Sequence, residues 1–149
     1  MKKLSLLGLT LGVCLASPAM ALEHKVVIEH PEGPIAADYA GTVNVETRQT
    51  GSVGAAGRPS TLRCQWSASL SLERTAQVGD SLKTRREMRR DDVATGSAPG
   101  WCRNSAKAID QLVEARRETF RSAMLDLVAQ DRAALLAEAG RSEAAGRDS

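Results

Sequence analysis

The stretch that decides the fold is residues 61–74, which read TLRCQWSASLSLER. Apolar and polar residues alternate along it with a period of two, the pattern of an antiparallel strand with one buried side and one wet side. The apolar side carries Leu62, Cys64, Trp66, Ala68, Leu70 and Leu72. We therefore predict that this strand is the centre of a sheet, and that a covering element packs on the face to which Cys64 points.

Three more strands are predicted around it. Residues 24–30 are rich in β-formers and end before a proline turn, and residues 39–48 alternate with one apolar face. After a Gly-Asp turn at 79–80, residues 82–93 form a highly charged segment. A short helix is the alternative there, but the turn favours a strand, and a charged strand protects a sheet edge. Residues 94–100 are small and predict a loop.

The C-terminal third predicts one long amphipathic helix, because no glycine or proline lies between Gly100 and Gly140. Apolar residues recur there every three or four positions, and the stripe is Cys102, Ile109, Leu112, Val113, Phe120, Met124, Leu127, Val128, Ala134 and Leu135. At 1.5 Å per residue such a helix is about 57 Å long, so its end should overhang the sheet or fold back. Residues 140–149 predict a disordered polar tail.

The predicted fold class is α+β. A meander of about four antiparallel strands is packed on one face by the long C-terminal helix. The expected inward residues are Val43, Val45, Leu62, Trp66, Leu70 and Leu72 against Ile109, Val113, Phe120 and Met124. Residues 22–139 form a single domain in this prediction.

The first 21 residues predict a secretory signal peptide. Lys2 and Lys3 precede an apolar run, and Ala19-Met20-Ala21 is a small-residue cleavage site. The run is too short to span a bilayer, so no membrane span is expected after cleavage. A lipid anchor on Cys14 is the rival, although the bulky Val13 before it fits poorly. We expect a periplasmic or secreted protein.

Export would leave Cys64 and Cys102 as the cysteines of the mature chain, and an even count in an exported protein predicts a disulfide. Closing that loop would stabilise the fold by roughly 4 kcal/mol. The whole chain has 20 Lys+Arg and 18 Asp+Glu. Because the removed segment holds two lysines and no acid, the mature charge is balanced, and no nucleic-acid partner is expected.

The basic run of the fourth strand is the first candidate site, and its members are Lys83, Arg85, Arg86, Arg89 and Arg90. On a strand these side chains divide between two faces, so a solvated, protected edge explains them without a ligand. The functional alternative is an anionic envelope polymer or an acidic partner protein. No aromatic residue interleaves the run, which counts against single-stranded nucleic acid.

The second candidate site is the predicted new N-terminus, Leu22-Glu23-His24. A free amine, two backbone amides and an imidazole at the third position close the square-planar nitrogen set that Cu(II) or Ni(II) prefers. Histidine occupies a third position by chance in a few per cent of proteins. No other cofactor is predicted.

No catalytic constellation is visible, since no serine lies in a nucleophile-elbow context and the adjacent Asp91 and Asp92 would point to opposite faces. We therefore predict a binding or assembly module of unknown ligand, with the N-terminal metal protein and an unrecognised enzyme as alternatives. A protein partner or a second copy would bind apolar helix surface that the sheet leaves uncovered, on Phe120, Met124, Leu127, Val128 or Leu135.

Overall fold

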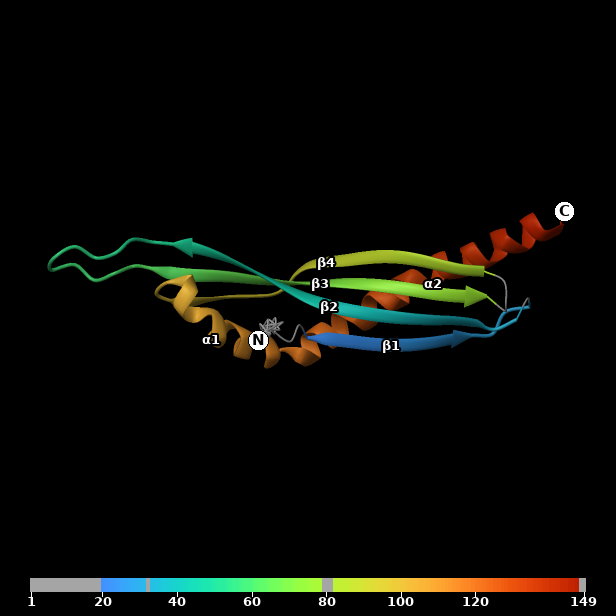
Figure 1. Cartoon of the computed structure of the whole chain (residues 1–149), viewed down its shortest axis with the longest axis horizontal. Coiled ribbons are helices and arrows are strands. Elements are labelled where there is room, and N and C mark those ends of the chain that lie inside the picture. The colour runs from blue at the N-terminus through green and yellow to red at the C-terminus, as the bar shows by residue number, and fades with distance from the viewer. Residues whose placement is uncertain (1–19, 32, 79–81, 148–149) are drawn as a thin grey trace, which may run out of the picture.

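The computed structural model describes residues 20–31, 33–78 and 82–147. Its four strands are β1 (Ala21–Ile28), β2 (Ile35–Thr50), β3 (Arg63–Val78) and β4 (Leu82–Pro99), and they form one antiparallel sheet in chain order. The helices α1 (Cys102–Glu114) and α2 (Arg117–Arg147) follow (Figure 1). The predicted α+β meander with its C-terminal helical layer is therefore confirmed. The predicted signal segment, up to residue 19, and the predicted turn at 79–81 lie outside the described residues.

The core lies between the helices and one face of the sheet. The alternation predicted for β3 is confirmed, since Cys64, Ala68, Leu70 and Leu72 are fully buried and Trp66 is 3% exposed. The helical side of the core is made by Ile109, Val113, Phe120, Ala123, Met124, Leu127 and Leu135. Of the predicted inward residues, two differ: Val45 remains 37% exposed at the margin of the helical layer, and Leu62 lies just before β3, is half-buried and does not join the core.

The helical layer is two helices, where the sequence predicted one. Neither glycine nor proline causes the break at residues 115–116. Arg116 donates from Nη1 to the Thr95 carbonyl at 2.8 Å, and its guanidinium lies 5.1 Å from the centre of the Trp66 ring. The chain thus turns where one side chain is anchored to the sheet, a tertiary contact that helical periodicity does not register.

Two predicted irregular segments are regular. The tail expected at 140–149 is instead helical to Arg147, because Gly140 and Gly146 each cost a helix only about 1 kcal/mol and most of the surrounding residues are good helix formers. The last turns of α2 extend beyond the strands (Figure 1). The loop expected at 94–100 is instead the last third of β4, where Ala94, Gly96 and Ala98 lie opposite Ala68, Trp66 and Cys64 of β3.

A bulge divides β4 into two parts. The register passes from Leu70 opposite Arg90 to Ala68 opposite Ala94, so β4 has extra residues at 91–93. Asp92 adopts a left-handed φ of 51°, and its carboxylate accepts a hydrogen bond from the Ser67 hydroxyl. Such a bulge twists an edge strand away from pairing with another chain.

The opposition of Gly96 and Trp66 gives a stability prediction. A Cβ at residue 96 would lie 2.6 Å from Cζ2 of Trp66, closer than real contacts allow. Because the indole is buried, Gly96→Ala should destabilise the domain by about 1–3 kcal/mol, measured from chemical denaturation. Gly140→Ala is the matched control, since nothing lies within 4 Å of its added Cβ and alanine favours the helix. Equal stabilities of Gly96→Ala and the parent chain would contradict this packing.

Candidate functional site

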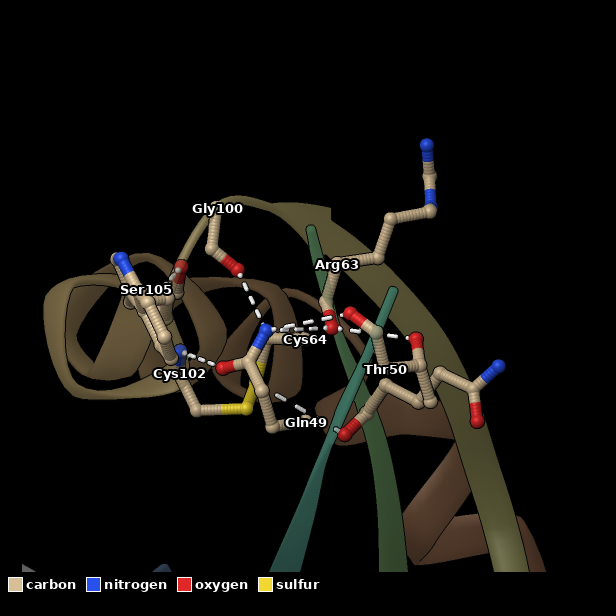
Figure 2. The surroundings of a disulfide bond; sticks show 9 residues. Gln49, Thr50, Arg63, Cys64, Gly100, Cys102 and Ser105 are labelled. Atoms are coloured by element: carbon tan, nitrogen blue, oxygen red, sulfur yellow. Dashed lines mark hydrogen bonds between the residues drawn. A yellow bond between two sulfur atoms is a disulfide. The ribbon is translucent and has the colours of Figure 1, made fainter. Parts of the chain in front are cut away.

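The predicted disulfide is present and joins β3 to the first residue of α1. Cys64 and Cys102 are 38 residues apart in sequence, and their Cα atoms are 4.8 Å apart. Because Cys64 points to the buried face, the bond holds the start of α1 against the sheet (Figure 2). The inference from parity and cysteine count was correct.

Next to this bond, the Gln49 side chain makes several hydrogen bonds that the sequence did not predict. Its Oε1 accepts from the backbone N–H of Cys102 at 2.8 Å, and its Nε2 donates to the carbonyls of Arg63 and Gly100 at 3.0 and 3.1 Å (Figure 2). Trp101, the N-cap residue of α1, makes no side-chain cap. A side chain of β2 therefore supplies the missing cap from 53 residues away in sequence.

The arginines of the basic run are paired with carboxylates of the same chain. Arg85 contacts Glu73 at 2.5 Å and Arg89 contacts Asp91 at 2.5 Å on the open face, while Arg86 contacts Asp131 at 3.2 Å and Arg90 contacts Asp126 at 3.1 Å on the helical face. The hydrogen bond from Arg89 also holds the pKa of the Asp91 carboxyl below its usual value. The run is divided between two faces, as predicted, and its charge is largely compensated. Anion or acidic-partner binding by Lys83 and these arginines stays a prediction.

The predicted metal-binding triplet lies among the first residues of the edge strand β1. Leu22 and His24 pair with Gly41 and Tyr39 of β2, and Leu22 is 8% exposed. Successive N–H groups of an extended strand point in opposite directions, whereas a square-planar site needs the amides of Glu23 and His24 on one metal. Copper or nickel binding there stays a prediction, and it would require these residues to leave the sheet.

A buried ionic cluster under α2 was missed altogether. Arg74 on β3 is fully buried and donates to Asp131 at 2.9 Å and to Glu138 at 2.5 Å. The Tyr39 hydroxyl donates to the same Asp131 oxygen at 3.1 Å. Burial, together with the Asp131 carboxylate, raises the pKa of Tyr39 to about 12, so the phenol stays a neutral donor at physiological pH. With Arg86, the cluster has two positive and two negative groups. Its arginines lie on the sheet and its carboxylates on α2, so the paired charges connect α2 to the sheet.

Part of the β2 edge beside α1 has no neighbouring strand among the described residues, because β1 is shorter than β2. β1 has 8 residues and pairs only with Ile35–Thr42, whereas β2 has 16 and continues to Thr50 along β3. Among the described residues, no strand pairs with the other side of β2 from Val43 to Thr50. Side chains from Asn44 to Gln49 are exposed there. Figure 1 shows β2 and β3 continuing well past the start of β1.

A cavity of about 670 Å³ adjoins this open segment, between β2, α1 and the first described residues, Met20 and Ala21. Val43, Val45 and Val113 form an apolar part of its lining, and Lys107, Asp110 and Glu114 of α1 add charged groups. We call Val43–Thr50 the open edge, and the cavity beside it the α1 groove. An unpaired backbone edge next to an apolar, charge-lined groove is the arrangement that binds an extended polypeptide.

Comparison of the chain with protein-family models, curated proteins and solved structures finds no match.

Other kinds of site have less to support them. Within residues 20–31, 33–78 and 82–147, no three His, Cys, Asp or Glu side chains gather as metal ligands. In the same ranges no helix combines the length and apolarity needed to cross a bilayer. The apolar stripe proposed for a partner is covered by the sheet, since Phe120 is fully buried and Met124 is 2% exposed. These two side chains are therefore not available to a partner, and partner binding through the helix stays a prediction.

Proposed function

We propose that this chain is a small exported, disulfide-bonded binding or assembly module, and that it holds an extended polypeptide segment along the open edge. The unpaired side of β2 from Val43 to Thr50 carries this proposal. Main-chain hydrogen bonds to such an edge supply affinity, and the pockets beside it select alternate side chains of the added strand.

Other edges of the sheet are better protected. The outer edge of β4 is interrupted by the bulge at Asp92 and is lined with arginines. The outer edge of β1 carries the exposed Lys25, and a lysine on an edge strand opposes pairing with another chain. The open edge has no proline and no bulge, and Val45 is exposed beside a groove large enough for side chains. These differences favour the open edge as the docking surface.

Export is supported by the disulfide and by the leader-like sequence of residues 1–21. Disulfides persist in oxidising compartments and are rare in the cytosol. The ion pairs within the basic run leave little free charge for nucleic acid, in keeping with a protein partner.

Site-specific photo-crosslinking tests the proposal. The full gene is expressed with a benzophenone amino acid in place of Val45, and intact mass gives the first residue of the exported chain, expected to be Leu22. Irradiation of cells should give one discrete adduct, because position 45 faces the docked strand. Val27, exposed on β1, is the matched control position and should give none. Absence of an adduct at position 45, or the same adduct from position 27, would contradict the docking surface.

A further inference from the structure

We propose that the segment bound at the open edge is the same segment of a second copy, so that two sheets join through their β2 strands in a symmetric dimer. This inference rests on the proposed function and specifies its partner. It follows from the length of the open edge, from the parity of its residues and from the positions of two opposite charges.

Symmetry restricts the possible registers. Two antiparallel β2 strands in one continuous sheet are related by a two-fold axis perpendicular to it, so a side chain faces only residues on its own side of the sheet. The axis must therefore lie midway between one residue and the same residue of the second copy, and not level with a point between two successive residues of a strand. Overlap of the open edge, Val43–Thr50, is greatest when that residue is Glu46 or Thr47.

Charge selects between these two registers. With the axis at Glu46, the two Glu46 carboxylates lie directly opposite each other, which is unfavourable. With the axis at Thr47, each Glu46 lies opposite Arg48 of the other copy, and two complementary pairs form. Arg48 makes no ion pair among the described residues, and Glu46 reaches only Arg89, at 3.9 Å. The Thr47 register therefore uses charges that the single domain leaves largely uncompensated.

The same register fits the surroundings of the edge. In this register the paired segment of each copy ends next to Gly51, where the chain adopts a left-handed φ of 81° and leaves the strand. The inward side chains of the added strand, Val45 and Thr47, would point to the face that carries the α1 groove. Both helical layers then lie on one side of the joined sheet. The start of β1 lies immediately beside the last paired residues, so cleavage before Leu22 leaves room for the second copy.

Charge exchange tests the register. Exported wild-type protein should sediment as a dimer. Glu46→Arg places arginines opposite arginines, and Arg48→Glu places glutamates opposite glutamates, so each variant alone should dimerise at least about tenfold more weakly. An equal mixture of the two variants restores both complementary pairs and should sediment as a heterodimer. Lys25→Glu is the matched control on the outer edge of β1 and should remain dimeric.

The outcomes separate the two proposals. A wild-type monomer at all concentrations, single variants that stay dimeric, or a mixture that stays monomeric would overturn the second-copy register. Loss of the dimer in Lys25→Glu would move the interface to β1 and overturn it as well. If the chain is monomeric but the Val45 crosslink joins it to a different exported protein, the docking surface stands and only the second copy is rejected. Circular dichroism of each variant confirms that the sheet is folded.

Discussion

Replacing Arg74 with alanine should destabilise the domain by about 3–5 kcal/mol, because it leaves a buried carboxylate without its main cationic partner. Arg74 and the Asp131 side chain are both fully inaccessible, and Glu138 loses its partner at the same time. Tyr39 and Arg86 remain beside Asp131, but a phenol at pKa about 12 supplies only one neutral hydrogen bond, and the Arg86 side chain is 45% exposed and partly hydrated. Chemical denaturation measures the free energy of unfolding.

Arg85→Ala provides the matched control for this prediction. Arg85 and Glu73 are also 2.5 Å apart on strands of the same sheet, but their side chains are 73% and 44% exposed. An exposed pair contributes about 0–1 kcal/mol, so the two alanine variants should differ by several kcal/mol. The double variant Arg74→Met, Asp131→Leu removes both buried charges and should recover much of the loss. Equal costs for Arg74→Ala and Arg85→Ala would show that Arg74 is hydrated in solution.

Removal of the disulfide has the second largest expected effect. Cys64→Ala with Cys102→Ala opens a 38-residue loop and should lower the free energy of unfolding by about 4 kcal/mol, through the added entropy of the unfolded chain. Denaturation with and without reductant measures the effect. Reductant should destabilise the wild-type chain by a similar amount and should leave the alanine variant unchanged.

Mass spectrometry provides an independent control for the bond. The native chain should weigh two hydrogens less than its reduced form, and neither Cys64 nor Cys102 should react with a maleimide. Two reactive thiols in the folded protein would contradict the position of α1. Equal stabilities of the oxidised and reduced chains would contradict the entropic account of its contribution.

The hydrophobic pattern was sufficient for the sheet and for its bond to the helix, but it misled us about buried charge. Arg74 falls on the same parity as Leu70 and Leu72, so strict alternation already pointed it inward. Asp131 lies four residues after Leu127 and four before Leu135, on the buried stripe of α2. Two opposite charges at buried periodic positions were the available signal. The predicted apolar side of the strand ended at Leu72, before Arg74, and the predicted helical stripe passed over Asp131.

Other differences came from contacts between distant segments, which local patterns do not contain. Ala94, Gly96 and Ala98 resemble a loop because they are small, and Gly96 must be small because the Trp66 ring of β3 occupies the space opposite it. The break before α2 depends on Arg116 reaching Thr95. Each is a tertiary constraint that overrides local propensity.

The candidate site was hidden for a related reason. The predicted strands at 24–30 and 39–48 had unequal lengths, but an open edge becomes visible only when register fixes which residues of β2 remain unpaired. The alternation of β2 was clear from Val43 to Thr47, and it gave no indication that β1 begins opposite Thr42. Similarly, Gln49 is an ordinary strand residue in sequence and becomes the cap of α1 only in three dimensions.

The two tryptophans occupy opposite environments, which gives the protein its own pair of optical reporters. Trp66 is 3% exposed beneath Arg116, whereas Trp101 is 41% exposed next to Cys102. Acrylamide should therefore quench the emission of Trp101 and spare that of Trp66 in the native chain. Unfolding followed with and without the quencher would separate release of the helix junction at Arg116 from opening of the disulfide end. Fluorescence alone can thus tell whether the helical layer lifts from the sheet as one body or from one end first.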